Sequence, residues 1–81
     1  MRIPRDVGGE DFVKLLKTLG YRITRQTGSH IRLAFIGKKE HHITIPNHKP
    51  IKIGTLNNIL RDISEYHKIS KEELIEKLWN D

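Results

Sequence analysis

The chain has 81 residues, enough for a single domain over residues 1–81 and too few for a second one. Because it has no cysteine, disulfides, thiolate nucleophiles and thiolate zinc sites are excluded. Fifteen Lys and Arg against ten Asp and Glu give a formal net charge of +5, which favours a polyanionic partner. The sequence has neither an apolar run long enough to span a bilayer nor the layout of a signal peptide, so we expect a soluble, cytoplasmic protein.

The first predicted element is an amphipathic helix. Apolar residues recur at i, i+3, i+4 and i+7 in Phe12, Leu15, Leu16 and Leu19. Acidic residues 10 and 11 would lie at the positive amino end of this helix, and Gly20 would stop it.

Two paired strands follow, because the apolar residues then alternate with polar ones over 21–27 and 31–35. Gly28-Ser29 between them fits a two-residue hairpin turn with Gly28 at the first central position, where positive φ is required. This turn would place Thr27 opposite His30 and so set the register of the hairpin.

A third strand is predicted over residues 42–45, ended by Pro46, which gives a three-stranded antiparallel meander. Leu56, Ile59, Leu60 and Ile63 then have helical spacing, so a second helix should start near Gly54 and cover the sheet. We expect residues 62–69 to link it to a short last helix that begins with a capping box over residues 70–73. Helix, three strands and two helices imply an α+β fold with the helices on one face of the sheet.

The uncovered sheet face should carry the polar chemistry. If Ile31, Leu33 and Phe35 point inward, strand alternation places the residues between them on the outward face. The side chains expected there are Arg22, Thr24, Gln26, His30, Arg32, His42 and Thr44. The charge distribution fits, since residues 1–61 hold twelve basic and four acidic side chains, a net of +8, and residues 62–81 hold three and six, a net of −3. Imidazole, guanidinium and hydroxyl groups on a rigid sheet suit phosphate binding and proton transfer, although solvated strand faces are also routinely polar.

Three short motifs add a family resemblance. Gly28-Ser29-His30, then Ile43–His48, and then Gly54-Thr55-Leu56 with Ile59-Leu60 occur in an order and spacing that resembles the HicA-type mRNA interferase toxins. The resemblance covers roughly residues 9 to 64. It implies a fold like the double-stranded RNA-binding domain, cleavage of mRNA, and neutralisation by a cognate HicB-type antitoxin. The family's catalytic histidine follows the glycine-serine pair, so that role carries over to His30.

RNA supplies its own nucleophile, the 2′-hydroxyl, so a metal-free nuclease needs a base to take that proton and cations to stabilise the phosphorane. We expect His30 to be the base and no cofactor to be used. The expected RNA contacts are Ser29, Arg22, Arg32, Lys49, Lys52 and His48. The two lysines would work together with the amino end of the second helix.

Other interpretations of these residues remain open. A metal site among the histidines is disfavoured, because adjacent His41 and His42 face opposite ways on a strand and carboxylates are scarce. The spacing of Trp79 with Ile75 favours core packing over stacking on a base. The alternatives to a ribonuclease are a non-catalytic binding module for double-stranded RNA or other nucleic acid, and a basic surface that docks an acidic protein.

Overall fold

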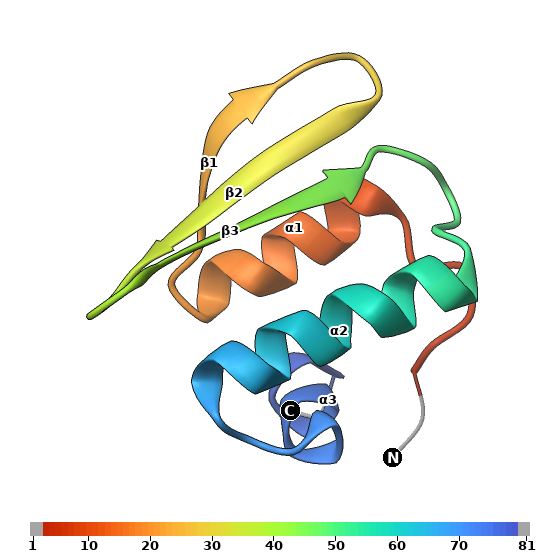
Figure 1. Cartoon of the computed structure of the whole chain (residues 1–81). Coiled ribbons are helices and arrows are strands. Elements are labelled where there is room, and N and C mark those ends of the chain that lie inside the picture. The colour runs from red at the N-terminus through yellow and green to blue at the C-terminus, as the bar shows by residue number, and fades with distance from the viewer. Residues whose placement is uncertain (1–2, 80–81) are drawn as a thin grey trace. The chain divides into compact units, whose positions relative to one another are not determined.

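The computed structural model describes residues 3–79 and has the predicted order of elements. These are α1 (Gly9–Thr18), β1 (Arg22–Gln26), β2 (His30–Ile36), β3 (Glu40–Pro46), α2 (Ile53–His67) and α3 (Lys71–Trp79), as Figure 1 shows. The chain forms two compact units: residues 6–51 hold α1 and the sheet, and the described residues from 52 onward, with residues 3–5, hold α2 and α3. No helix within residues 3–79 combines the length and apolar character that crossing a membrane requires.

Helix α1 forms as its spacing predicts. Phe12, Val13 and Leu16 are buried, and acidic residues occupy the first turn, where the helix dipole favours them. The helix ends where expected, because Gly20 has a φ of +110°, a conformation that side-chain-bearing residues rarely adopt. A side chain at Gly20 would also collide with the ring of Phe35.

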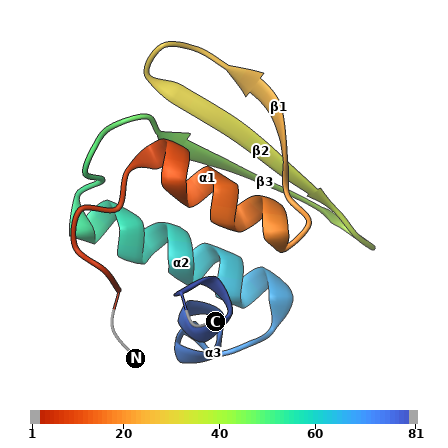
Figure 2. The same ribbon diagram turned by 180° about the vertical axis from the view of Figure 1, so that it is seen from behind.

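The three strands form an antiparallel meander in the order β1-β2-β3, as predicted. Side chains alternate along β2 and β3, so Ile31, Leu33, Ile43 and Ile45 point to the core and are buried, while Ala34 is a small residue buried on the other face. Helix α1 lies against one face of the sheet in both Figure 1 and the reverse view of Figure 2. Each large apolar side chain buried in this layer contributes roughly 1.5–3 kcal/mol to folding.

A buried polar pair also belongs to this unit. The hydroxyl of Tyr21 lies 2.7 Å from Nδ1 of His41, and the two rings meet edge to face with their centroids 5.8 Å apart. His41 and His42 face opposite sides of β3, the first buried and the second exposed, as the alternation predicted. The hydrogen bond satisfies a hydroxyl and an imidazole that would otherwise be costly to bury.

In the second unit, α2 is longer than the sequence analysis expected. The predicted link over residues 62–69 is wrong, because α2 continues to His67 and turns only at Lys68, which has a left-handed φ of 58°. Ile63 and Ser64 extend the buried stripe by another turn, and neither Gly nor Pro interrupts it. The predicted cap of α3 is confirmed, since the amide of Glu73 donates to Oγ of Ser70 at 3.0 Å. Helix α3 packs on α2 and buries Leu74, Ile75 and Leu78.

The backbone at Gly9, the first residue of α1, lies so close to the loop after β3 that it leaves no room for a side chain. The amide of Gly9 donates to the carbonyl of His48 at 2.8 Å, and a Cβ on Gly9 would lie 2.3 Å from the carbonyl oxygen of Pro46. The loop after β3 therefore rests directly on the first turn of α1.

We expect Gly9→Ala to lower the free energy of unfolding by about 1–3 kcal/mol, because α1 and the loop must separate to admit the methyl group. Thermal and urea unfolding would measure the loss. Gly54→Ala is the matched control, since a Cβ there meets nothing within 4 Å and lies in a helix. Equal stability of the two variants would contradict the close approach.

Candidate active site and nucleic-acid interface

His30 lies at the first position of β2, where a side-chain hydroxyl closes the hairpin. The amide of Thr27 donates to the carbonyl of His30 at 2.9 Å, and the amide of His30 donates to Oγ1 of Thr27 at 3.1 Å. Thr27 and His30 therefore face each other, as predicted. The predicted positive φ of Gly28 is wrong, since among the described glycines only Gly20 has one. In the predicted turn the His30 amide would donate to the carbonyl of Thr27. Here it donates to the Thr27 hydroxyl, so the turn is of another type.

The turn is also braced from the loop after β3. The amide of Asn47 donates to the carbonyl of Ser29 at 2.9 Å, and its side-chain amide donates to the carbonyl of Gly28 at 3.5 Å. Oγ of Ser29 lies 3.1 Å from Nδ1 of His30. The exposed imidazole is thus held through Nδ1, and its Nε2 remains available to a ligand.

The outward sheet face consists of three cross-strand rows. His30 pairs with Pro46 in the first row, and Arg32 pairs with Thr44 on β3 in the second. In the third row Ala34 pairs with His42 on one side and with Arg22 on the other. His30, Arg32, His42 and Thr44 are all exposed, which confirms their predicted outward orientation.

On β1 the predicted alternation fails at one point. A register shift between Ile23 and Arg25 brings Arg25 opposite Arg32, and Gln26 opposite the buried Ile31. Thr24 is the extra residue at this shift and has no cross-strand partner on β2. Gln26 therefore does not join the outward row as predicted, and Arg25 does. A bulge adds one residue to a strand and reverses the direction of the side chains that follow it. Counting residues along β1 could not reveal Arg25.

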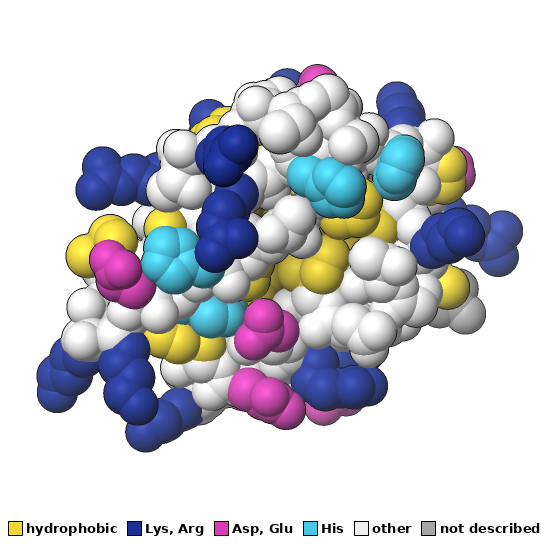
Figure 3. Space-filling model, turned by 45° about the horizontal axis from the view of Figure 1, so that its top comes forward, with side chains coloured by type: hydrophobic (Ala, Val, Ile, Leu, Met, Phe, Trp, Pro, Cys, Tyr) yellow, Lys and Arg dark blue, Asp and Glu magenta, His cyan; other side chains and the backbone are white. Residues whose placement is uncertain are grey.

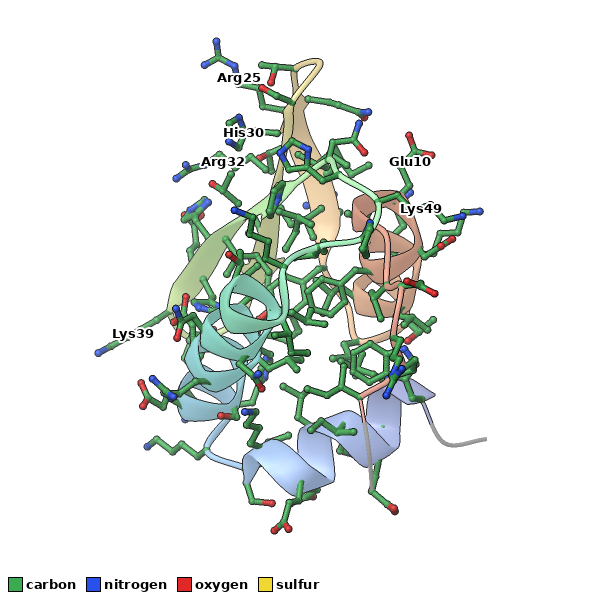
Figure 4. All side chains as sticks on the ribbon, turned by 90° about the vertical axis from the view of Figure 1, so that its right-hand side faces the viewer. Glu10, Arg25, His30, Arg32, Lys39 and Lys49 are labelled. Carbon is green, nitrogen blue, oxygen red and sulfur yellow. The ribbon has the colours of Figure 1, made fainter. Side chains whose placement is uncertain are left out.

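Three basic groups converge as a result. Figure 4 shows Arg25, His30 and Arg32 pointing to the same side of the sheet, away from α1. Within residues 3–79, the guanidinium groups of Arg22, Arg25 and Arg32 form no ion pair or side-chain hydrogen bond. Glu40, the acidic residue of β3, contacts His42 and not an arginine: its carboxylate accepts from Nε2 of His42 at 3.3 Å. Figure 3 shows Lys, Arg and His side chains beside one another on this side.

The remaining predicted contacts lie elsewhere. His48 and Lys49 line a pocket of about 310 Å³ together with Asn47, Gly8 and the first three residues of α1. Lys49 extends beside Glu10, on the opposite side of the unit from His30, as Figure 4 shows. Lys52 precedes the first residue of α2 in the other unit. The structure therefore places Arg32 next to His30 and Arg22 two rows away on the same face, but does not bring Lys49 to them.

The described part of the chain contains no group of three His, Cys, Asp or Glu side chains arranged to hold a metal ion. His30 and His42 occupy the first and third rows of the outward face, and His41 faces the core. The chemistry that this face offers is proton transfer by imidazole and anion binding by arginine.

The exposed imidazole of His30 lies beside arginines that have no acidic partner within residues 3–79, and such a basic face suits an anionic ligand. Comparison with known families makes the assignment specific. The family model described as the HicA toxin of bacterial toxin-antitoxin systems matches residues 9–64, more than half of the chain. The chain therefore belongs to the HicA toxin family, whose members are toxins with a cognate antitoxin. Searches of curated proteins and of solved structures found no match.

We expect Thr27→Val to loosen the hairpin that carries His30, because the His30 amide loses its acceptor while the side-chain shape is kept. The expected cost is about 1 kcal/mol of stability, with faster hydrogen exchange at the His30 amide. Thr44→Val is the matched control, since the Thr44 hydroxyl makes no hydrogen bond within residues 3–79. Unchanged exchange at His30 in Thr27→Val would show that the hydroxyl does not close the turn.

Proposed function

We propose that this toxin is a metal-independent endoribonuclease that cleaves mRNA, with His30 as its catalytic residue. The observation that carries the proposal is the exposed imidazole of His30, held at a closed hairpin and set beside Arg32 on the same strand face. Membership of the HicA toxin family supports the same assignment.

In the proposed mechanism, Nε2 of His30 takes the proton of an RNA 2′-hydroxyl. The freed 2′-oxygen attacks the adjacent phosphorus, and the bond from phosphorus to the 5′-oxygen breaks. The products are a 2′,3′-cyclic phosphate and a 5′-hydroxyl, whose proton comes from the imidazolium or from water. The hydrogen bond between Nδ1 and Oγ of Ser29 would hold the ring so that Nε2 faces the RNA.

Arginine side chains on the same face would hold phosphates of the RNA backbone on either side of the cleaved bond. Arg32 follows His30 by two residues on β2, and Arg22 lies in the third row of the face. Both are exposed, and guanidinium forks match phosphate oxygens. His48 would contact RNA beyond the cleavage point, because the loop that carries it starts at Pro46, opposite His30. No RNA contact near the cleavage point is assigned to Lys49, which points away from His30, or to Lys52, which belongs to the other unit.

The arrangement predicts slow chemistry. His42, the other exposed histidine of this face, lies two rows from His30 and is engaged by Glu40. His30 would thus serve as the single proton-transfer residue, and each missing participant costs roughly 10²–10⁴-fold in rate.

The first experiment compares wild type, His30→Ala and His42→Ala expressed from a tightly regulated promoter. We expect wild type and His42→Ala to arrest growth and degrade mRNA, and His30→Ala to do neither. Circular dichroism and protein levels would show that all three accumulate folded. A harmless wild type would favour a non-catalytic RNA-binding module, and an equally toxic His30→Ala would move the active site elsewhere.

Purified protein refines this test. His30→Ala should cleave RNA at least about 10²-fold more slowly than wild type, and EDTA should not slow the wild type. An oligonucleotide of the same sequence with 2′-deoxyribose throughout should bind but remain intact, because its nucleophile is missing. Cleavage of that DNA would contradict the role of the 2′-hydroxyl.

The cognate antitoxin provides a further prediction. If a HicB-type partner neutralises the toxin by covering His30 and the basic face, the purified complex should bind and cleave RNA much less than the free toxin does. Gel-shift and cleavage assays on the two preparations would measure the difference. Equal cleavage by the complex would exclude occlusion as the mode of neutralisation.

A further inference from the structure

We propose that Arg25 and Arg32 form a two-guanidinium clamp for one backbone phosphate of the RNA, next to the phosphate that is cleaved. This inference rests on the proposed ribonuclease function, because it takes RNA to be the ligand of this face. It assigns a binding role to Arg25, which the sequence pattern on β1 did not select.

The geometry of the pair is set by the sheet. Arg25 and Arg32 are Cα partners on adjacent antiparallel strands, and their side chains leave the same face. Directly opposed residues have Cβ atoms about 4.5–5.5 Å apart, so two guanidinium groups can reach one tetrahedral phosphate from two sides. His30 lies two residues before Arg32 on this face, roughly 7 Å away along the strand.

The energetics also point to an anion. Two like charges directly opposite on neighbouring strands destabilise a sheet, and no acidic side chain within residues 3–79 pairs with either arginine. The bulge after Ile23 creates this juxtaposition, since uninterrupted alternation would have sent Arg25 to the other face. The sheet thus holds two arginines together at a cost that a bound phosphate would remove.

The other outward side chains indicate how the RNA would be recognised. They include Arg22, Thr44 and His42 and no Phe, Tyr or Trp, while Tyr21 is buried and Phe35 packs against it with ring centroids 5.3 Å apart. Aromatic side chains are the usual platforms for bases in single-stranded RNA. A face without them binds through phosphates, so the clamp would tolerate most base sequences.

The test measures RNA binding in the His30→Ala background, where the RNA is not cleaved. Fluorescence anisotropy with a short single-stranded RNA would compare His30→Ala alone with the same protein carrying Arg25→Gln, Arg25→Lys or Lys14→Gln. Lys14 is an exposed cation of α1, so Lys14→Gln controls for the loss of one charge. Titrations at several salt concentrations would give the slope of affinity against salt.

We expect Arg25→Gln to weaken binding about tenfold or more and to reduce the salt slope by roughly 0.7, and Lys14→Gln to change both little. Arg25→Lys should recover part of the affinity, because it restores the charge but not the fork. Adding Arg32→Gln to Arg25→Gln should cost less than the two single losses combined, since both groups hold one phosphate. Thermal unfolding of Arg25→Gln should show no loss of stability, because the substitution removes a repulsion.

Equal binding by the Arg25→Gln and Lys14→Gln proteins would overturn the clamp while leaving the role of His30 intact. Additive losses at Arg25 and Arg32 would overturn the single shared phosphate. Absence of RNA binding by the folded His30→Ala protein would contradict the proposed function itself. A destabilised Arg25→Gln protein would show a structural role for Arg25 in place of a binding one.

Discussion

The site depends on how Thr27 closes the first hairpin. Its amide and its hydroxyl both bind backbone groups of His30, so the first residue of β2 and the position of the imidazole are fixed by the same two hydrogen bonds. In the register of β2 with β3, His30 lies opposite Pro46, and the loop after β3 returns to brace the turn through Asn47. Residues far apart in the chain thereby form one rigid edge around an exposed histidine.

Much of the fold follows from local patterns in the sequence. The apolar spacing of α1, the alternation in β2 and β3 and the serine cap of α3 each predicted the observed element, because each reflects a short-range rule. The end of α2 was missed because residues 62–67 contain fewer apolar side chains than the first half of the helix. Their buried side includes Ser64, a polar residue that the apolar pattern does not select. The turn type was missed because a hydroxyl replaced a carbonyl as acceptor, a choice that residue types alone do not reveal.

The candidate site was predictable wherever the strands are regular. His30 and Arg32 followed from alternation on β2, and the glycine-serine-histidine motif drew attention to the same residue. Arg25 could not be found this way, because a bulge shifts side-chain direction without any glycine or proline to mark it. The direction of Lys49, away from His30, could not be predicted either, since the course of its loop around α1 depends on tertiary contacts such as the bond between Gly9 and His48.

The bulged strand has a consequence beyond ligand binding. β1 is an edge of a three-stranded sheet, and all five of its residues are exposed, so its unpaired backbone groups could recruit a strand from another molecule. Charged side chains and bulges are the devices by which natural sheets discourage such edge-to-edge association, and β1 has both in Arg22, Arg25 and the irregularity between them. The feature that gathers positive charge near His30 thus also protects a small protein against aggregation.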